Sequence, residues 1–553
     1  MSSRHAGEPL STVLEGVVQE HAAARIILSL NPTTGEPIGR VESAGPEAID
    51  AAVDQAASVL KLWHRTSWKE RNTHLARLAA LIHEQAEDIA QLIAAEQGKP
   101  VLEALALEVL PALDHLRFLA RHAQRLTSAE GIWPREPLYA HKRSHYLYDS
   151  IGVVALITPF NLPFALPLVQ IGAALAMGNA VVLKPSELTP LCGDRLGELV
   201  IQAGFPEGLV QVIHTEREDG LFLVANGRVD KIFFTGSRET SHQIVAGAGW
   251  MPRPVVLSLG GKHPSVVVAD ADLDRAARGV VWGALANCGQ NCGSIERVYV
   301  QEAVAARFVE RVLAEVDRLR VGNPLSEEVD LGPLSSEMRR QQVHAHVTEA
   351  VDAGALRLRG GEIPDGPGFF YPPTVLLNPP LDCRLLQEET LGPVIPIVLV
   401  EHLEQGILLA NDTDYALTAS GWTSSAANAD RLMEGLQAGV VTVNDVLYSF
   451  GEPASTWSGY KASGMGHNHG KPGLREMSRV KFASYDPAPS EAPVFAYPYD
   501  QARNHIVRRV MNALHSSSFA ERIGALARLL FSKHFRARVS MRSFLPAWKN
   551  RSK

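Results

Sequence analysis

The sequence predicts an α/β protein with two doubly wound domains, a small flanking sheet and a helical C-terminal extension. A chain of 553 residues is too long for one core, because cores split into domains beyond roughly 250–300 residues. Short apolar runs alternate with helix-length segments through most of the chain, which is the pattern of parallel sheets covered by helices. Residues 501–553 differ from everything before them because they are strongly basic.

The first part of the chain is predicted to be mainly helical. Between Thr73 and Ile93, apolar residues recur at the spacing of one helix face, namely at Leu75, Leu78, Ile82, Ala86, Ile89 and Ile93. Gly98 and Pro100 then stop the helical pattern. We assign residues 25–135 to the first domain.

Residues 151–257 are predicted to complete this domain with a parallel sheet. Its strand-like runs are IGVVALI, NAVVL, LVQVI, KIFF and PVVLS. Such a sheet binds ligands at the carboxyl ends of its strands, so we expect a nucleotide site there. The uncharged run from Ile151 to Leu183 is long enough for a membrane span. Because prolines and Asn161 interrupt it, we interpret it as a buried strand followed by a loop.

Residues 258–478 are predicted to form a second α/β domain, so the two sheets should meet near residue 258. Its strand-like runs are SVVVAD, RVYV, IPIVLV, LTASGW and GVVTVN, with a helix around residues 273–286. Two further segments, SHYLYDS at 144–150 and RVKFASYD at 479–486, flank the domains. We expect them to form a separate small sheet within residues 136–150 and 479–497.

Residues 498–553 are predicted to be a basic amphipathic extension. From Gln501 onwards, twelve Lys and Arg residues oppose Glu521 alone, so this tail carries +11 and the rest of the chain −18 of the overall −7. Phe519, Ile523, Leu526 and Leu530 share one helical face, surrounded by Arg522, Arg528, Lys533, Arg536 and Arg538. Such a helix can lie on an anionic membrane surface. It can equally pack on the acidic body of its own chain or of a partner subunit.

Composition and cysteine content restrict the class of protein. The chain has 46% hydrophobic and 20% charged residues, an ordinary globular mixture, and its negative net charge gives no reason to expect nucleic acid as a partner. Four cysteines are too few for a disulfide framework, and no signal peptide precedes residue 30. We therefore expect a cytoplasmic protein, with peripheral membrane contact through the tail as an open alternative.

Cys292 is the candidate reactive residue. It lies in NCGQNCGSIERVYV, a loop of small residues between a predicted helix and strand, where the backbone can hold an exposed thiol. Any single cysteine is more often a buried apolar side chain, so the loop alone does not establish reactivity. Cys288 lies four residues earlier, but no nearby histidine or second cysteine pair completes a zinc site. We expect no metal.

Seven motifs, in register, resemble those of the aldehyde dehydrogenase superfamily. They are TPFNLP at 158–163, GNAVVLKPSELTP at 178–190, FFTGS at 233–237, LGGKHP at 259–264, GQNC at 289–292, EETLGPV at 388–394 and GVVTVND at 439–445. The resemblance extends from about Asn31 to about Tyr485 and is far more specific than one glycine motif. It implies an aldehyde dehydrogenase-like fold, with an NAD(P)-binding domain at 25–135 and 151–257 and a catalytic domain at 258–478. The implied reaction is the NAD(P)-dependent oxidation of an aldehyde to a carboxylic acid.

The resemblance also implies the catalytic roles. Cys292 would be the nucleophile whose thiolate attacks the aldehyde carbon and, after hydride transfer, holds the product as a thioester. The Asn161 side-chain amide and the Cys292 backbone N–H would form the oxyanion hole, where two donors can contribute several kcal/mol. An unperturbed cysteine has a pKa of about 8.5, so a local positive potential or a nearby base is needed at neutral pH.

The implied cofactor is NAD, with NADP as the alternative. Lys184 and Glu187 would hold the adenosine ribose, and the Glu187 carboxylate mildly favours NAD because it would repel a 2′-phosphate. Gly236 and Ser237 precede a helix whose N-terminus can face the pyrophosphate. Glu389 would hold the nicotinamide ribose, with Leu391 against the ring. The other residues assigned to the cofactor site are Thr158, Pro159, Phe160, Ser186, Leu259 and Gly260.

Three positions depart from the family pattern, and all are tied to proton movement. Ser258 replaces the glutamate that activates water for thioester hydrolysis in most members, and a serine hydroxyl is no general base at neutral pH without a partner. Gln170 stands where a lysine is frequent, and Asn468 where an acidic residue is common. His467 and His469 are candidate replacements for the base, although ordinary surface histidines are the simpler interpretation.

Three functional hypotheses follow. The first is an NAD-preferring dehydrogenase that forms a carboxylate with water activated by another group. The second is an acylating enzyme that passes the acyl group to coenzyme A, since some members that do so also lack the glutamate. The third is a weakly active homologue that serves as a binding or scaffold protein. Trp282 and Tyr448 to Phe450 are candidates for an apolar substrate tunnel, and the resemblance implies a dimer or tetramer formed through the flanking sheet.

Overall fold

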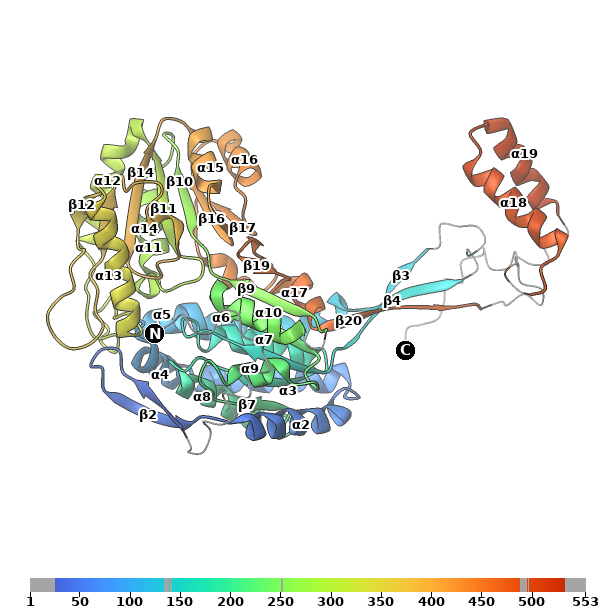
Figure 1. Cartoon of the computed structure of the whole chain (residues 1–553), viewed down its shortest axis with the longest axis horizontal. Coiled ribbons are helices and arrows are strands. Elements are labelled where there is room, and N and C mark those ends of the chain that lie inside the picture. The colour runs from blue at the N-terminus through green and yellow to red at the C-terminus, as the bar shows by residue number, and fades with distance from the viewer. Residues whose placement is uncertain are drawn as a thin grey trace. The chain divides into compact units, whose positions relative to one another are not determined.

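The structure, a computed structural model, describes residues 25–133, 139, 142–249, 252–487, 495 and 497–532 (Figure 1). These residues fall into two compact units. The first comprises the described residues up to Leu126 together with Ser150–Arg479, and the second comprises Thr127–Asp149 and the described residues from Val480 onwards. Lys533, Arg536 and Arg538 of the basic tail lie outside the described residues.

The first unit contains a six-stranded sheet in the order β19-β9-β8-β5-β6-β7. All neighbours pair in parallel except β19, which pairs antiparallel with β9. The chain runs from β5 outwards through β6 and β7 and then returns to β8 and β9 on the other side, so the strand order reverses at β5. Ligands bind at such switch points. The strands are β5 (Val153–Ile157), β6 (Ala180–Lys184), β7 (Val210–Val212), β8 (Lys231–Gly236), β9 (Val255–Leu259) and β19 (Gly464–Met465).

Every residue of β5 and β6 is buried, because helices α2 and α7 both pack on these strands. This confirms the predicted doubly wound sheet. The helices around this sheet are α2 (Pro46–Trp63), α3 (Trp68–Glu84), α4 (Ala86–Gln97), α5 (Val101–Ala104), α6 (Leu110–Leu126), α7 (Ala165–Ala176), α8 (Pro190–Gln202), α9 (Gly220–Ala225), α10 (Arg238–Gly249) and α17 (Gly470–Glu476).

The helical pattern predicted between residues 73 and 93 is interrupted. Gln85 has φ −109° and ψ 17°, which separates α3 from α4. No glycine or proline marks the break. The Gln85 side chain instead accepts a hydrogen bond from Arg195 of α8 (2.5 Å), a tertiary contact that the local sequence does not reveal. The predicted end is confirmed, since Gly98 caps α4 with φ 96°.

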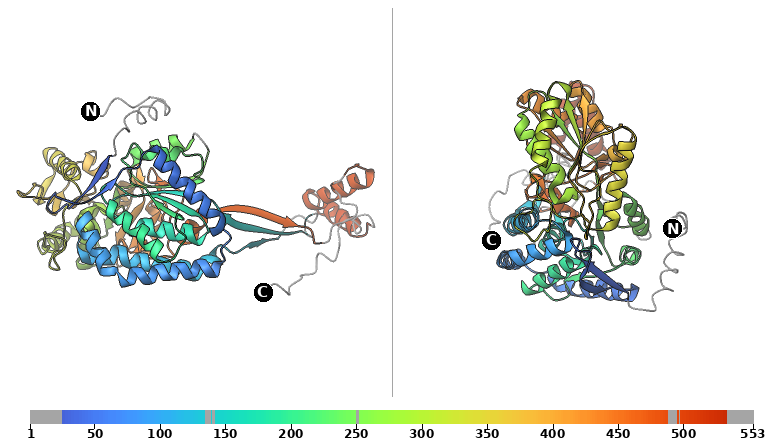
Figure 2. Two further views of the ribbon diagram at one scale, coloured as in Figure 1. Left: turned by 90° about the horizontal axis from the view of Figure 1, so that it is seen from below. Right: turned by 90° about the vertical axis from the view of Figure 1, so that its left-hand side faces the viewer.

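A seven-stranded sheet in the order β12-β13-β14-β11-β10-β16-β17 forms the rest of the first unit. Its strands are β10 (His263–Val267), β11 (Ile295–Gln301), β12 (Leu356–Arg359), β13 (Thr374–Leu377), β14 (Val394–Val400), β16 (Thr418–Trp422) and β17 (Val440–Val443). Helices lie on both faces (Figure 2), namely α11 (Leu273–Leu285), α12 (Glu302–Val316), α13 (Glu337–Asp352), α15 (Leu403–Asn411) and α16 (Ala426–Gly435). The chain passes from one sheet to the other between Leu259 and His263, as predicted.

The second unit contains a three-stranded sheet and two helices. The sheet has the order β20-β4-β3, with β3 (Glu130–Ile132), β4 (Arg143–Ser150) and β20 (Ser478–Tyr485). Helices α18 (Gln501–His515) and α19 (Phe519–Leu530) share a small core of Ile506, Val510 and Leu529. A helical C-terminal extension is therefore present. The exact domain boundaries remain predictions.

Candidate active site

The residues predicted to form the site line one cavity in the first unit. The cavity lies at the carboxyl ends of β5, β8 and β9, where the nucleotide site is predicted. Both predicted groups line it: the catalytic Cys292, Asn161 and Ser258, and the cofactor residues Thr158, Pro159, Phe160, Lys184, Ser186, Glu187, Gly236, Ser237, Leu259, Gly260, Glu389 and Leu391. The fold thus brings segments that are far apart in the sequence around one space.

Cys292 follows a tight loop that depends on left-handed backbone conformations. Asn287 and Cys288 adopt φ values of 57° and 54°, and Gly289 adopts 72°. A Cβ on Gly289 would lie 2.1 Å from the carbonyl oxygen of Gly392, so only glycine fits there. Strained backbone of this kind persists only where the surroundings fix it. The loop brings Cys292 to the wall of the cavity.

The environment of Cys292 keeps its thiol neutral in the protein alone. Cys292 packs against an apolar cluster that includes Leu162, Phe450 and Trp457. Burial raises the pKa of the Cys292 thiol to about 12, and the nearby Glu389 carboxylate adds to the shift. The positive potential required for a thiolate is therefore not supplied in full by these side chains.

The backbone of Asn161 is held by a buried ion pair. Its carbonyl oxygen accepts hydrogen bonds from Lys99 Nζ (2.8 Å) and Asn287 Nδ2 (3.1 Å). Lys99 also pairs with Glu108 (2.5 Å), and both side chains are fully buried. Glu108 in turn accepts hydrogen bonds from two backbone N–H groups at the start of α7 (2.8 and 2.9 Å). The segment carrying Asn161 is thereby fixed beside the loop of Cys292. Sequence reasoning missed both charges, because isolated charged residues usually lie on the surface.

The far end of the cavity suits the adenosine and phosphate groups of a dinucleotide. Lys184 Nζ lies 3.5 Å from Glu187 Oε2, and burial lowers the pKa of the lysine. The Glu187 carboxylate is half exposed and can accept from ribose hydroxyls. Ser237 Oγ accepts a hydrogen bond from the Thr240 N–H (3.2 Å) and so caps α10. The N-terminus of α10 reaches the cavity, where its backbone N–H groups favour an anion.

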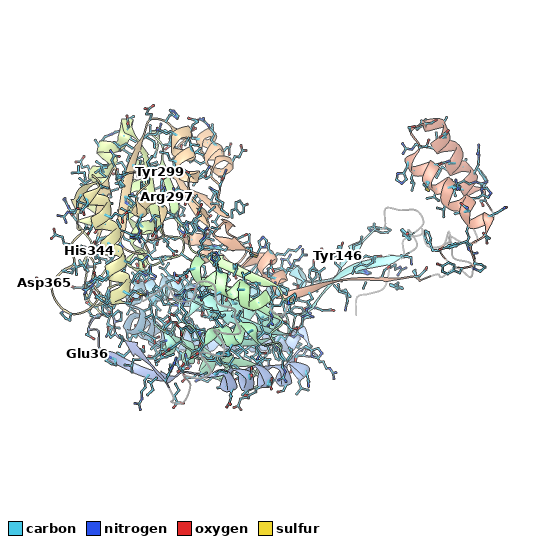
Figure 3. The ribbon with its side chains drawn as sticks, in the orientation of Figure 1. Glu36, Tyr146, Arg297, Tyr299, His344 and Asp365 are labelled. Carbon is cyan, nitrogen blue, oxygen red and sulfur yellow. The ribbon has the colours of Figure 1, made fainter. Side chains whose placement is uncertain are left out.

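A second buried ion pair supports the other end of the cofactor cavity. Leu391 has φ 49°, and its N–H donates to Glu296 (2.9 Å). Glu296 pairs with Lys262 (2.5 Å) within the core. The Lys262 carbonyl oxygen accepts a hydrogen bond from Nε of the buried Arg297 on β11 (2.9 Å). Figure 3 labels Arg297 in the region of the seven-stranded sheet. These contacts fix the segment that presents Glu389 and Leu391 to the cavity.

Two of the three residues that depart from the family's proton-transfer pattern, Gln170 and Asn468, lie in a neutral region. Gln170 Nε2 donates to Asn468 Oδ1 (3.1 Å), which is a pair of amides. They line a separate small cavity together with His115 and His469. His469 is buried, so its interpretation as a surface histidine is wrong; burial and the neighbouring His115 hold its pKa well below the usual value. His467 is partly exposed, 3.5 Å from Glu476. Neither histidine lines the cavity that contains Cys292.

Other residues that belong to no recognised sequence motif also line the cavity. They include Arg217, Gln243, Met338 and Arg339. The Arg339 guanidinium carbon lies 5.9 Å from the ring centre of Phe160. Of the residues predicted to line a substrate tunnel, Tyr448 and Phe450 line a further cavity, whereas Trp282 does not line it. Among the described residues, no cluster of His, Cys, Asp and Glu side chains could hold a metal ion.

Comparison with known proteins agrees with this arrangement. The model of the aldehyde dehydrogenase family matches residues 18–483. The chain belongs to the aldehyde dehydrogenase family. An aldehyde dehydrogenase of Paenarthrobacter nicotinovorans is 34% identical, covering 82% of this chain and 98% of that protein. The NADP⁺-dependent succinate-semialdehyde dehydrogenase GabD of Escherichia coli is 34% identical, covering 82% of this chain and 92% of that protein.

Solved structures give the same fold. An aldehyde dehydrogenase of Bacillus cereus, solved as its NAD⁺ complex, superposes with a TM-score of 0.80 and 31% identity, covering 84% of this chain and 94% of that one. This chain is thus an NAD(P)-dependent oxidoreductase that oxidises an aldehyde to a carboxylic acid. The two alternatives, transfer of the acyl group to coenzyme A and a weakly active binding or scaffold protein, are not favoured. The family match ends at residue 483, before α18 and α19.

Proposed function

We propose that Cys292 carries the covalent chemistry of this dehydrogenase and that Asn161 positions and stabilises the reacting oxygen. The observation that carries the proposal is that Cys292, Asn161 and the twelve predicted cofactor residues line one cavity. The sulfur would attack the aldehyde carbon, and the Asn161 amide with the Cys292 N–H would donate to the developing oxyanion. Two donors fixed before the reaction cost no reorganisation when the charge appears.

The cofactor residues have roles that follow from their chemistry. Glu187 would accept from the adenosine ribose, the N-terminus of α10 with Gly236 and Ser237 would face the pyrophosphate, and Glu389 would accept from the nicotinamide ribose. When bound, the oxidised nicotinamide supplies the hydride acceptor and a positive charge. The half-exposed Glu187 carboxylate would disfavour a 2′-phosphate, so NAD is the preferred cofactor of the pair.

The experiment follows NADH when the enzyme, NAD and hexanal are mixed, before and after addition of coenzyme A. Steady NADH production without coenzyme A is expected. A burst that continues only after coenzyme A is added would make the product a thioester, and NADH below one equivalent per chain would indicate a nucleotide-binding homologue. Cys292→Ser serves as the control, and normal turnover by that variant would overturn the role of Cys292.

We also infer a homodimer or homotetramer formed through the flanking sheet. Four large apolar side chains of this sheet are exposed, which is typical of an interface. They are Tyr146, Val480, Phe482 and Tyr485. Light scattering should give a mass of two or four chains, and Phe482→Asp should lower it. A monomer for the unaltered protein would exclude this assembly.

For the C-terminal extension we propose peripheral contact with an anionic membrane from the cytoplasm. Phe519, Ile523, Leu526 and Leu530 of α19 are at least half exposed, so the predicted apolar face does not form the core shared with α18. Arg522 and Arg528 lie on the same helix. No helix among the described residues is long and apolar enough to cross a bilayer. Deletion of residues 501–553 should abolish binding to phosphatidylserine vesicles at low salt, and unchanged binding would end the proposal.

A further inference from the structure

The cavity on the substrate side defines the class of aldehyde that the site can accept. This cavity is lined by residues of α6, the 3₁₀ turn Tyr448–Phe450 and the segments next to the predicted catalytic residues. Leu162 directly follows Asn161, and Asn291 directly precedes Cys292. The cavity therefore lies against the two residues that would bind the reacting carbonyl group.

Most of the residues that line this cavity are apolar. Leu110 and Tyr448 line it and are more than half exposed. Leu162, Phe450 and Trp457 are buried and belong to the cluster that contacts Cys292. The Phe450 and Trp457 rings meet edge to face, with centroids 5.8 Å apart. An alkyl or aromatic chain can lose its hydration against these side chains, whereas a charged group cannot.

One charged residue, Asp114, is found among the residues that line this cavity. It lies on α6 next to His115. His115 is buried, and this burial lowers its pKa. Asp114 and Glu452 both act electrostatically on His115, so two carboxylates lie in this part of the fold. Lys, Arg and His are not found among the lining residues. A substrate carboxylate entering here would meet negative charge and no counter-ion.

We propose that this dehydrogenase takes apolar aldehydes without a negative charge, and that Asp114 excludes aldehydes that carry a second carboxylate. The inference rests on the function proposed for Cys292, because it assigns the adjoining cavity to the aldehyde tail. It separates this chain from its relative named for succinate semialdehyde, an anion. The side chains that line the cavity, and not the overall sequence identity, decide which aldehyde is accepted.

The test compares kcat/KM for hexanal and for 6-oxohexanoate, two aldehydes of equal chain length. The value for hexanal should be at least about tenfold higher, the scale of discrimination in apolar pockets. Asp114→Asn should raise the value for 6-oxohexanoate relative to that for hexanal. Tyr448→Arg, which places a cation at an exposed position of the lining, should raise the value for 6-oxohexanoate further.

Equal or better turnover of 6-oxohexanoate by the unaltered enzyme would overturn the assignment. An unchanged ratio in both variants would also overturn the role of Asp114. Failure of the underlying function gives a different result, because no aldehyde would then produce NADH. Asp430→Asn, an exposed change on α16 at a residue that does not line the cavity, is the matched control and should leave the ratio unchanged.

A second inference comes from the cofactor cavity and concerns the missing base. Ser258 lines the cavity where a glutamate is common. No histidine lines the cavity, and its carboxylates are Glu187 and Glu389. Glu187 lies at the adenosine end beside Lys184. Glu389 lies against Gly260, where a Cβ would be 1.9 Å from its Oε1 atom.

We infer that Glu389 replaces the missing base and activates the water that hydrolyses the Cys292 thioester. The carboxylate takes a proton from water as the water oxygen bonds to the thioester carbon. The C–S bond then breaks with its electron pair on sulfur, and the proton passes from Glu389 to sulfur or solvent. Thioester and water thus give carboxylic acid and thiol, with no oxidant or reductant. The same carboxylate serves first as the ribose acceptor and afterwards as the base.

The electrostatics around Glu389 suit this role. Burial raises the pKa of Glu389 to about 7, and the buried Glu296 carboxylate adds to the shift. The positive charges of Arg339 and Lys262 lower the pKa of Glu389. The Glu389 carboxylate in turn raises the pKa values of Tyr415 and Cys292. A base with a pKa near the working pH is effective. Hydrolysis should therefore accelerate as the pH rises through about 7.

The test acylates Cys292 with p-nitrophenyl acetate in the absence of cofactor and follows decay of the acetyl adduct by intact-protein mass. Glu389→Gln should slow the decay by about 100-fold or more and abolish its rise near pH 7. Adding Ser258→Glu to that variant should restore the decay. Glu388→Gln, at the neighbouring exposed carboxylate, is the matched control. Equal decay in Glu389→Gln and the unaltered enzyme would overturn the base, whereas the absence of any adduct would overturn the role of Cys292.

Discussion

The two regions that meet near the predicted nucleophile are built from different chemistry. Around Asn161 and Leu391, buried ion pairs hold the backbone: Lys99 with Glu108 and Lys262 with Glu296, each at 2.5 Å. Around Gln170, the polar contacts are a neutral amide pair and two buried histidines. In the proposed mechanism, positioning for attack and hydride transfer would depend on these buried charges. The proposed base, Glu389, lines the cavity of Cys292 and not the one lined by Gln170.

The largest expected effect is a loss of stability when the Lys99–Glu108 ion pair of the first region is removed. Lys99→Met leaves Glu108 buried without its partner and should lower the free energy of unfolding by about 3–5 kcal/mol. Gln170→Met removes one neutral hydrogen bond and should cost only about 1 kcal/mol. Urea unfolding of both variants gives the comparison. Equal losses would show that the two regions do not differ in this way.

The second prediction concerns thiol reactivity. Because the pKa of Cys292 is raised to about 12, its thiolate fraction at pH 8 is about three orders of magnitude smaller than that of an unperturbed cysteine. Alkylation of Cys292 by iodoacetamide in the cofactor-free protein should be slower by the same factor. Because the pKa is raised, the rate should keep rising above pH 10. A plateau near neutral pH would contradict this environment, and Cys292→Ser identifies the labelled residue.

The third prediction tests the oxyanion donor. Asn161→Ala should lower the rate of the first NADH turnover by about 10²–10³-fold, the usual cost of one such donor. Its backbone contacts to Lys99 and Asn287 use the carbonyl group and remain available. Stopped-flow fluorescence measures the step. Asn504→Ala, an exposed change on α18, is the control, and a similar burst in both variants would exclude the role.

The smallest expected effect concerns cofactor choice. Glu187→Gln removes the half-exposed carboxylate that would repel a 2′-phosphate. The ratio of kcat/KM for NADP to that for NAD should rise by about tenfold, which corresponds to about 1.4 kcal/mol. Measuring both cofactors at fixed aldehyde concentration provides the check. A ratio that stays constant would mean that Glu187 does not contact this part of the cofactor.

Strand periodicity predicted the two sheets, and the ordered motifs predicted part of the cavity lining, because both are local signals. Arg217 and Arg339 also line the cavity but belong to no motif. The break at Gln85 was not predictable, since it depends on a contact with Arg195 of another helix. The supporting pair of Lys99 and Glu108 was missed for a similar reason: a charged residue in a helical segment gives no local sign that it is buried. His469 shows the same limit, as it is buried rather than exposed.

Acylation of Cys292 is the central claim, and mass analysis of the quenched reaction tests it most directly. The enzyme is mixed with NAD and hexanal, stopped with acid after one turnover, and digested for peptide mass. A hexanoyl group is expected on Cys292 in the unaltered enzyme and nowhere in Cys292→Ser. An acyl group on another residue, or full NADH production by Cys292→Ser, would contradict the account.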